Sequence, residues 1–204
     1  GQNTLVLVDA AQSFGMLPLD LPGLGVDFYA FTGHKWWCGP AGVGGLYIST
    51  EAIAQHRPTF IGWRGVTQWD STTEVALSQD ARRYEVATSA YPLYVGLMEA
   101  IRLHQQWGDM ASRYQQICDR SAYCWEKLNA IPQVQCLKTT PPTSGLVSFQ
   151  VDTAQSHSDI VKALEAQGFC LRTIRFPDCI RACTHYFTTP ADIDQLAIAL
   201  TTLT

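Results

Sequence analysis

The sequence lacks any apolar run that approaches the roughly 20 residues of a transmembrane helix, so we expect no membrane span. It is also poor in positive charge, because 14 lysines and arginines face 18 aspartates and glutamates and leave a formal net charge of −4. This balance argues against nucleic acid or an anionic membrane as the main partner. Repeats and low-complexity tracts are absent, and the 47% hydrophobic content is sufficient for one or two cores.

Regular cysteine spacing is missing as well. The seven cysteines form no C-x-x-C pair and no pattern typical of a disulfide framework. The arrangement nearest to a metal site is Cys179, Cys183 and His185, and it lacks a fourth ligand. We therefore predict free thiols, no metal site and a cytoplasmic protein, since thiols stay reduced in the cytosol.

The most informative stretch that is present runs from Val26 to Ser49. Its start, Asp27 to Phe31, is predicted to be a strand, and glycine-rich turns lead from it to a second strand at Leu46 to Ile48. Lys35 lies at the break between them, among aromatic residues that would desolvate an ammonium group and favour Schiff-base chemistry. The alternative is an ordinary solvated lysine.

A second stretch, Leu5 to Gln12, supports a site at this break. Leu5 to Val8 is a continuous apolar run that predicts a buried strand of a parallel sheet, with Asp9 at its C-terminal end. Ligands of open α/β sheets bind outside the carboxyl ends of strands, so Asp9 and Lys35 are expected to face one crevice. The alternative for Asp9 is an N-cap on the residues that follow.

The rest of the chain alternates between helical and extended patterns. Hydrophobic spacing predicts a helical turn at 50–55, helices from Tyr91 onward and over 110–128, strands at 146–151, 169–173 and 180–187, and a helix at 158–167. A last helix begins at Thr189, with Pro190 and Asp192 in its first turn. We expect 60–74 to be a loop whose tryptophans, Trp63 and Trp69, either border a pocket or a subunit interface or pack locally.

Four motifs carry a resemblance to a known family: VDAAQ at 8–12, GHKW at 33–36, RRYEVATSAYP at 82–92 and IRACTHYFTTPADIDQL at 180–196. Together they resemble the class-V aminotransferases, which are fold-type-I enzymes that use pyridoxal 5'-phosphate (PLP). The resemblance implies an α/β chain that is the C-terminal half of such an enzyme. Residues 1–91 would be the second part of the large mixed-sheet PLP domain, and 92–204 connecting helices and a small α+β C-terminal domain. The aromatic residue that stacks on the cofactor ring would lie in the N-terminal half.

The resemblance also implies roles for individual residues. PLP would be held by Lys35 as an aldimine, with Lys35 also moving the proton at the substrate Cα. The other implied cofactor contacts are Asp9 to the pyridine nitrogen, Gln12 to the phenolic oxygen, and Thr32, His34 and Thr88 to the phosphate. Thr88 would reach the phosphate across a dimer interface, which implies a homodimer with a shared active site. Arg172 and Arg181 match the position for the substrate carboxylate, and Trp63 is a further candidate for substrate binding; solvated strand arginines are the alternative.

The family contains cysteine desulfurases, C–S lyases and kynureninases. Desulfurases carry a nucleophilic cysteine on a long mobile loop, whereas here only TIRFPDC, ending at Cys179, precedes Arg181. We therefore predict a C–S lyase that converts L-cystine or L-cysteine by β-elimination to pyruvate, ammonia and a persulfide or sulfide, and supplies sulfur to an acceptor such as an iron–sulfur apoprotein. The alternatives are a cysteine desulfurase giving alanine and an enzyme persulfide, or an epimerase. A nucleotide-binding module is disfavoured because GHK precedes GPAGVGG, which fits neither phosphate-binding motif; a cofactor-free interaction domain is the last alternative.

Overall fold

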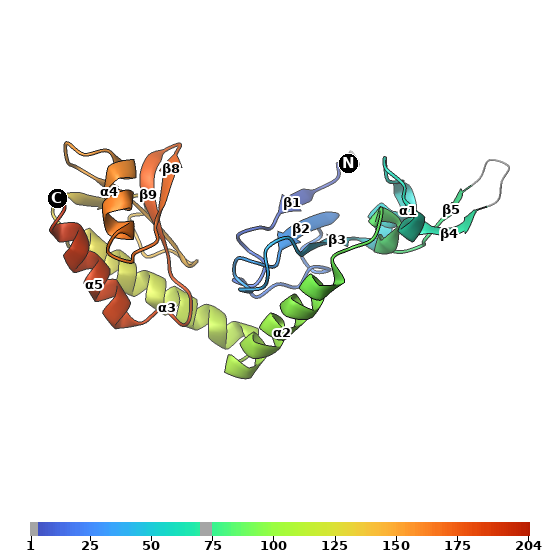
Figure 1. The fold of residues 1–204 in the computed structure, drawn as a ribbon, viewed down its shortest axis with the longest axis horizontal. Helices are drawn as coiled ribbons and strands as arrows, with labels where there is room; N and C mark the ends of the chain where they lie inside the picture. The colour runs from blue at the N-terminus through green and yellow to red at the C-terminus, as the bar shows by residue number, and fades with distance from the viewer. Residues whose placement is uncertain (1–3, 70–74) are drawn as a thin grey trace. The chain divides into compact units, whose positions relative to one another are not determined.

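The computed structural model describes residues 4–69 and 75–204. The chain divides into two compact units, Gly1–Trp107 and Gly108–Thr204, which we describe separately (Figure 1). The helix that begins at Tyr91 lies in the first of these units. The assignment of a PLP domain and a small domain to these parts of the chain remains a prediction.

The first unit is built on a three-stranded mixed sheet of β1 (Leu7–Asp9), β2 (Phe28–Thr32) and β3 (Gly44–Ile48), in that order. Strands β1 and β2 are parallel, as predicted, and β3 is antiparallel to β2. The expectation that β1 is buried is wrong, because the Leu7 side chain is 68% exposed. Its continuous apolar run is typical of a strand covered on both faces, and the described residues do not supply that cover.

Short elements follow the sheet. They are α1 (Thr50–Gln55), the 3-10 turn η1 (Trp63–Gly65), β4 (Val66–Trp69), β5 (Val75–Leu77) and the 3-10 turn η2 (Ala81–Tyr84). Helix α1 agrees with the prediction, and Ser49 caps it by accepting a hydrogen bond from the Ala52 N–H. The segment 60–74, predicted as a loop, instead contains η1 and β4, and β4 pairs with β5 just beyond it, so that prediction is wrong. Its residues 70–74 lie outside the described residues.

Helix α2 (Tyr91–Trp107) packs on the loop that carries Lys35. A Cβ added to Gly33 or Gly39 would lie within 3 Å of the Leu97 side chain, so these two glycines allow a close approach of helix and loop. His104 is buried, and its Nε2 lies 3.0 Å from the Trp37 carbonyl oxygen. His104 is therefore a packed helix residue, as predicted, and it anchors the end of the same loop.

The second unit combines three helices with one antiparallel sheet among its described residues. Its elements are α3 (Met110–Asn129), β6 (Val134–Cys136), β7 (Leu146–Val151), α4 (His157–Glu165), β8 (Arg172–Arg175), β9 (Asp178–Cys183) and α5 (Pro190–Thr201). The sheet is antiparallel with the order β6-β7-β9-β8, and Phe149 and Ile180 are fully buried in its core. Thr189 and Asp192 form the predicted capping box at the start of α5. None of the helices among the described residues is long and apolar enough to cross a membrane.

Candidate functional site

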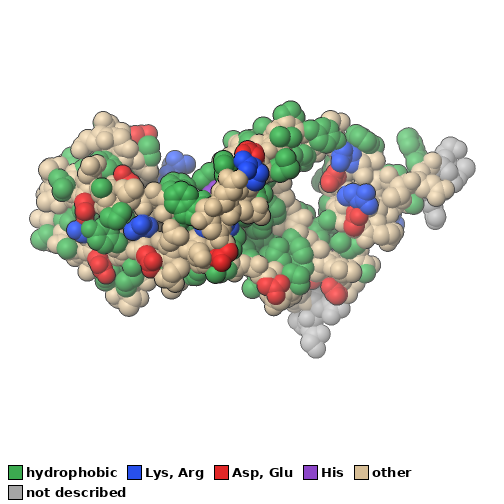
Figure 2. Space-filling model, turned by 90° about the horizontal axis from the view of Figure 1, so that it is seen from below, with side chains coloured by type: hydrophobic (Ala, Val, Ile, Leu, Met, Phe, Trp, Pro, Cys, Tyr) green, Lys and Arg blue, Asp and Glu red, His purple; other side chains and the backbone are tan. Residues whose placement is uncertain are grey.

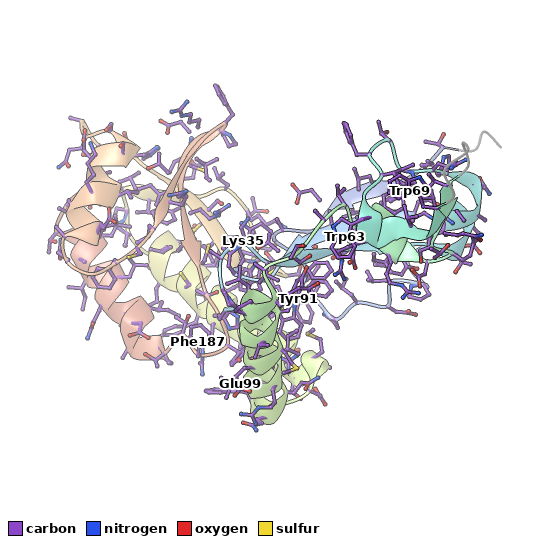
Figure 3. All side chains as sticks on the ribbon, turned by 45° about the vertical axis from the view of Figure 1, so that its right-hand side comes forward. Lys35, Trp63, Trp69, Tyr91, Glu99 and Phe187 are labelled. Atoms are coloured by element: carbon purple, nitrogen blue, oxygen red, sulfur yellow. The ribbon has the colours of Figure 1, made fainter. Side chains whose placement is uncertain are left out.

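Lys35 lies just beyond the C-terminal end of β2, in the loop that leads to β3 (Figure 3). Its side chain is exposed, and its Nζ has no hydrogen-bond or ion-pair partner among the residues that the structure describes. The following Trp36 and Trp37 are only 5% and 7% exposed. The expectation that aromatic neighbours desolvate the Lys35 ammonium is therefore wrong for this chain, because both indoles turn into the core and leave the amine accessible.

Thr32 and His34 form a polar pair beside Lys35. The Thr32 Oγ1 lies 2.7 Å from the His34 Nδ1, and the His34 backbone N–H is 3.4 Å from the same oxygen. A hydroxyl, an imidazole and an ammonium group thus gather within four residues at the end of β2, which suits an anionic ligand. Thr88 is exposed between η2 and α2, and within the described part of the chain no hydrogen bond joins it to this group.

Asp9 ends β1, and it is in register with Ala30 of the parallel strand β2. Because the carboxyl ends of parallel strands meet at one edge of a sheet, Asp9 and the Lys35 loop lie at the same edge, as predicted. The Asp9 Oδ1 accepts a hydrogen bond of 3.0 Å from the Ala11 N–H. The capping alternative is therefore partly right, although the residues after Asp9 form turns rather than a helix. The Asp9 Oδ2 has no partner among the described residues.

Gln12 is linked directly to the Lys35 loop. Its Oε1 accepts a hydrogen bond of 3.1 Å from the Trp36 Nε1–H. Trp36 was not among the predicted site residues. Its need for an acceptor could have been predicted, because the N–H of a buried tryptophan requires one and a glutamine after β1 is a suitable acceptor.

Trp63 is 65% exposed at η1, so the alternative of local packing is wrong for it (Figure 3). The guanidinium carbon of Arg64 lies 5.7 Å from the Trp63 ring centroid. Arg64 donates from Nε to the Glu85 carboxylate at 2.7 Å and from Nη1 to the Tyr91 hydroxyl, and the bond to Glu85 raises the pKa of Arg64. Trp63 therefore presents an indole face beside a fixed cation.

Arg172 and Arg181 stand opposite each other in the second unit. They are register partners on the antiparallel strands β8 and β9, so their side chains project from the same face of the sheet. Neither forms an ion pair with an acid among the described residues, and the Arg181 Nε is buried without a hydrogen-bond partner there. Two unneutralised guanidinium groups side by side are suited to binding carboxylate.

The β8–β9 connection is a tight hairpin. Its turn consists of Phe176 and Pro177, because Arg175 already pairs with Asp178. Cys179 is 1% exposed within this hairpin, and burial raises the pKa of its thiol. The structure thus agrees with the interpretation that this connection is not a mobile loop that carries an exposed thiol. All seven cysteines are free.

Comparisons with known proteins place these features in a family. The model of the class-V aminotransferases matches residues 1–196. A probable cysteine desulfurase of Methanothermobacter thermautotrophicus is 30% identical over 216 residues, which cover 96% of this chain and 52% of that protein. The solved structure of the cystine C-S lyase C-DES with its reaction product cysteine persulfide is 52% identical, with a TM-score of 0.92 over 97% of this chain and 52% of that one.

A second structure of C-DES is a lysine-to-alanine variant with glycine covalently linked to the PLP cofactor. It is 51% identical and has a TM-score of 0.92, over 97% of this chain and 51% of that one. This chain thus spans about half the length of these relatives. The predicted fold class, part of a fold-type-I PLP enzyme, is confirmed by these matches. Because the family model matches nearly the whole chain, the chain belongs to the class-V aminotransferase family.

Proposed function

We propose that this chain is part of a PLP-dependent carbon–sulfur lyase that acts on L-cystine and, less readily, on L-cysteine by β-elimination. The observation that carries the proposal is the group at the sheet edge, where the unpartnered Lys35 amine and the Asp9 carboxylate lie at the ends of adjacent parallel strands. The likeness to the cystine C-S lyase C-DES supports it.

The residues present fit PLP. The cofactor needs an amine, an acid for its ring nitrogen and donors for its phosphate. Lys35 has a free amine, Asp9 has a carboxylate oxygen without a partner, and Thr32 and His34 gather polar atoms 2.7 Å apart. When bound, PLP supplies an electron sink that stabilises negative charge at the substrate Cα. Gln12 would donate to the phenolic oxygen.

In the proposed reaction Lys35 removes the substrate Cα proton, and the Cβ–S bond breaks with its electron pair moving to sulfur. From cystine the leaving group is cysteine persulfide, and from cysteine it is sulfide. The remaining three-carbon fragment takes up water and yields pyruvate and ammonia. The persulfide released from cystine is the weaker base and leaves more readily than the sulfide released from cysteine, so cystine is the better substrate.

The two opposed arginines support an anionic amino-acid substrate. Arg172 and Arg181 are register partners, and neither forms an ion pair with an acid among the described residues, so each guanidinium is available to a carboxylate. Cystine carries two carboxylates and therefore has a group for each cation. Trp63, with its exposed indole face, is proposed to border the substrate.

A cysteine desulfurase is the second candidate, because curated relatives carry that name. Such an enzyme needs a thiol that reaches the substrate sulfur. The two-residue turn of the β8–β9 hairpin and the 1% exposure of Cys179 favour elimination over thiol attack. An epimerase of the same family is a further alternative, and it would return the inverted amino acid.

The quaternary structure is proposed to be a homodimer with a shared active site, in which Thr88 of one subunit reaches the phosphate in the other. Figure 2 shows patches of hydrophobic side chains between polar and backbone atoms on one face. Exposed large hydrophobic residues along α2 support a subunit contact there: Tyr91, Tyr94, Val95, Met98 and Leu103. An iron–sulfur apoprotein is proposed as sulfur acceptor, and the free thiols support a cytoplasmic location.

Product analysis of the full-length protein tests the proposal. With PLP and cystine we expect pyruvate, ammonia and persulfide, and no pyruvate from the Lys35→Ala variant, which should keep its fold. Arg172→Ala and Arg181→Ala should raise KM for cystine much more than the dissociation constant for PLP. Alanine as the product from cysteine would establish desulfuration instead, and inversion without C–S cleavage would establish an epimerase.

A further inference from the structure

We propose that Trp36 is a positioning residue for Gln12: its indole N–H holds the Gln12 amide so that the NH2 end, and not the oxygen, faces the ligand at the sheet edge. The inference rests on the proposed PLP-dependent function. It goes beyond that proposal because it assigns a task to a buried residue that touches no ligand itself.

The chemistry of the contact decides which way the amide points. An indole nitrogen is a donor only, so the atom that it meets at 3.1 Å must be the Gln12 Oε1. The oxygen and the NH2 group of an amide diverge from the same carbon, so the two cannot point at one partner. Once the oxygen is held by Trp36, the NH2 group is the only end of Gln12 that remains to be offered elsewhere.

The backbone on which Gln12 stands is held independently of this bond. The next residue, Ser13, has its Oγ 2.6 Å from the Tyr29 hydroxyl, and Phe14 stacks on Phe31 with ring centroids 3.8 Å apart. Both partners belong to β2. The turn after β1 is therefore anchored to the sheet, and the Gln12 side-chain torsions are the freedom that the Trp36 bond removes.

The orientation matters for the proposed cofactor. The phenolic oxygen of PLP carries negative charge, so an NH2 group stabilises it whereas an amide oxygen would repel it. A freely rotating glutamine would sample both orientations and pay side-chain entropy on binding. Trp36 also follows Lys35 in the sequence, so its N–H links the turn after β1 to the loop that carries the catalytic amine.

The test is the Trp36→Phe variant of the full-length protein, which keeps an aromatic ring in the core and removes only the indole N–H and part of its bulk. We expect PLP to bind about 2- to 10-fold more weakly, as for the loss of one hydrogen bond. The pH midpoint of the visible absorption band of the PLP-loaded protein should rise by roughly half a unit or more, because the ring oxygen loses a fixed donor. Neither measurement requires turnover.

The matched control is Trp37→Phe. Trp37 is similarly buried and packs edge-on against His104, whereas the hydrogen bond to Gln12 comes from Trp36, so the loss of the Trp37 indole should leave the pH midpoint unchanged. In a Gln12→Ala background, Trp36→Phe should cause no further shift, because the bond that it breaks is already absent. A shift that adds fully to that of Gln12→Ala would overturn the assignment, as would a wild-type midpoint in Trp36→Phe.

A second variant keeps the inference testable if Trp36→Phe does not fold. Gln12→Glu retains an acceptor for the Trp36 N–H but has no NH2 group, so the midpoint should rise while the unfolding temperature stays close to that of the wild type. An unchanged midpoint would refute the role of the Gln12 donor. If the wild-type protein binds PLP but yields no pyruvate from cystine, the proposed lyase activity fails, and the positioning role of Trp36 is still measured by these spectra.

Discussion

Alkylation of the native full-length protein with iodoacetamide should modify Cys170 and Cys183 quickly and Cys179 slowly. The first two side chains are exposed, whereas Cys179 is 1% exposed in the β8–β9 hairpin. The thiolate is the reactive species, and burial raises the pKa of the Cys179 thiol, which lowers its thiolate fraction further. The reactivity of this thiol therefore bears directly on whether it can accept sulfur from a substrate.

The expected protection follows from the contacts that must open. To expose the Cys179 sulfur, β8 must separate from β9 at the pairs of Ile174 with Cys179 and Arg175 with Asp178. The hydrogen bond of 2.9 Å from the Gln150 side-chain amide to the Asp178 carbonyl oxygen must also break. At about 1 kcal/mol for each of the three interactions, opening costs about 3 kcal/mol. This free energy corresponds to alkylation roughly 100-fold slower than that of an exposed cysteine.

Mass spectrometry of tryptic peptides after timed alkylation measures these rates, and the denatured protein supplies the unprotected reference for each cysteine. After turnover with cystine or cysteine, Cys179 should carry no persulfide, and Cys179→Ser should form pyruvate at the wild-type rate. Alkylation of Cys179 as fast as that of Cys183, or a persulfide on Cys179 during turnover, would refute the reasoning and support a desulfurase.

Three further predictions concern stability. His157→Phe removes the acceptor of the Val151 N–H and should lower the free energy of unfolding by about 1–3 kcal/mol. Asp178→Ala removes only the 3.0 Å contact between its carboxylate, which is 70% exposed, and the His157 Nδ1, so it should cost at most about 1 kcal/mol; chemical denaturation compares the two variants. Gly65→Ala would place a Cβ 2.7 Å from a backbone oxygen of η2 and should cost about 1–3 kcal/mol, whereas Gly108→Ala, with its nearest atom at 3.7 Å, should be close to neutral. Burial raises the pKa of Cys124 to about 12. The neutral thiol therefore contributes fully to the free energy of unfolding below about pH 8.5, and this contribution is lost as the pH rises above that value. Denaturant midpoints of unfolding, measured from about pH 7 to 11, should fall less steeply for Cys124→Ala than for the wild type.

Local signals account for the elements that were predicted well. The bounds of α1 and β7 agree with the prediction, and so does the capped start of α5 at Thr189, because each is specified by residues within one or two turns of its ends. Strand pairing is less local. The β4–β5 pair was missed because its polar, tryptophan-containing sequence hides the alternation that indicates a strand.

Tertiary context explains the errors in β1 and in the C-terminal strands. An apolar run indicates that a strand needs other residues to cover both of its faces, but it does not show whether the described residues provide that cover. In this structure Leu7 remains 68% exposed. Strand β9 ends at Cys183 rather than at Phe187, and β8 begins at Arg172 rather than at Phe169. These ends are set by where the two strands can pair, and hydrophobic spacing does not specify that.

In the candidate site, too, features set by strand order could be predicted, whereas features set by side-chain orientation could not. The parallel-strand rule is sufficient to bring Asp9 and Lys35 to one edge, since it depends only on strand order and direction. The Trp36–Gln12 bond could not be predicted in this way, because it depends on which of two adjacent indoles turns toward the turn after β1. Motif resemblance identified the residues expected to touch the ligand, whereas the buried residue that orients one of them became visible only through its hydrogen bond.

The same distinction separates the two sulfur chemistries. Seven cysteines do not by themselves favour thiol attack or elimination, since a nucleophilic thiol must be both reachable and mobile. The TIRFPDC segment is too short to form a mobile loop that could carry a thiol to the substrate. In the structure, the residues on both sides of its two-residue turn are paired in strands β8 and β9, from Arg172 with Arg181 to Arg175 with Asp178. The pairing that aligns the two arginines for a carboxylate thus continues to Cys179, which is 1% exposed in the same hairpin. Thiol attack by Cys179 would require this hairpin to open at least at the Ile174–Cys179 pair, so the closed hairpin that holds the two arginines side by side favours elimination.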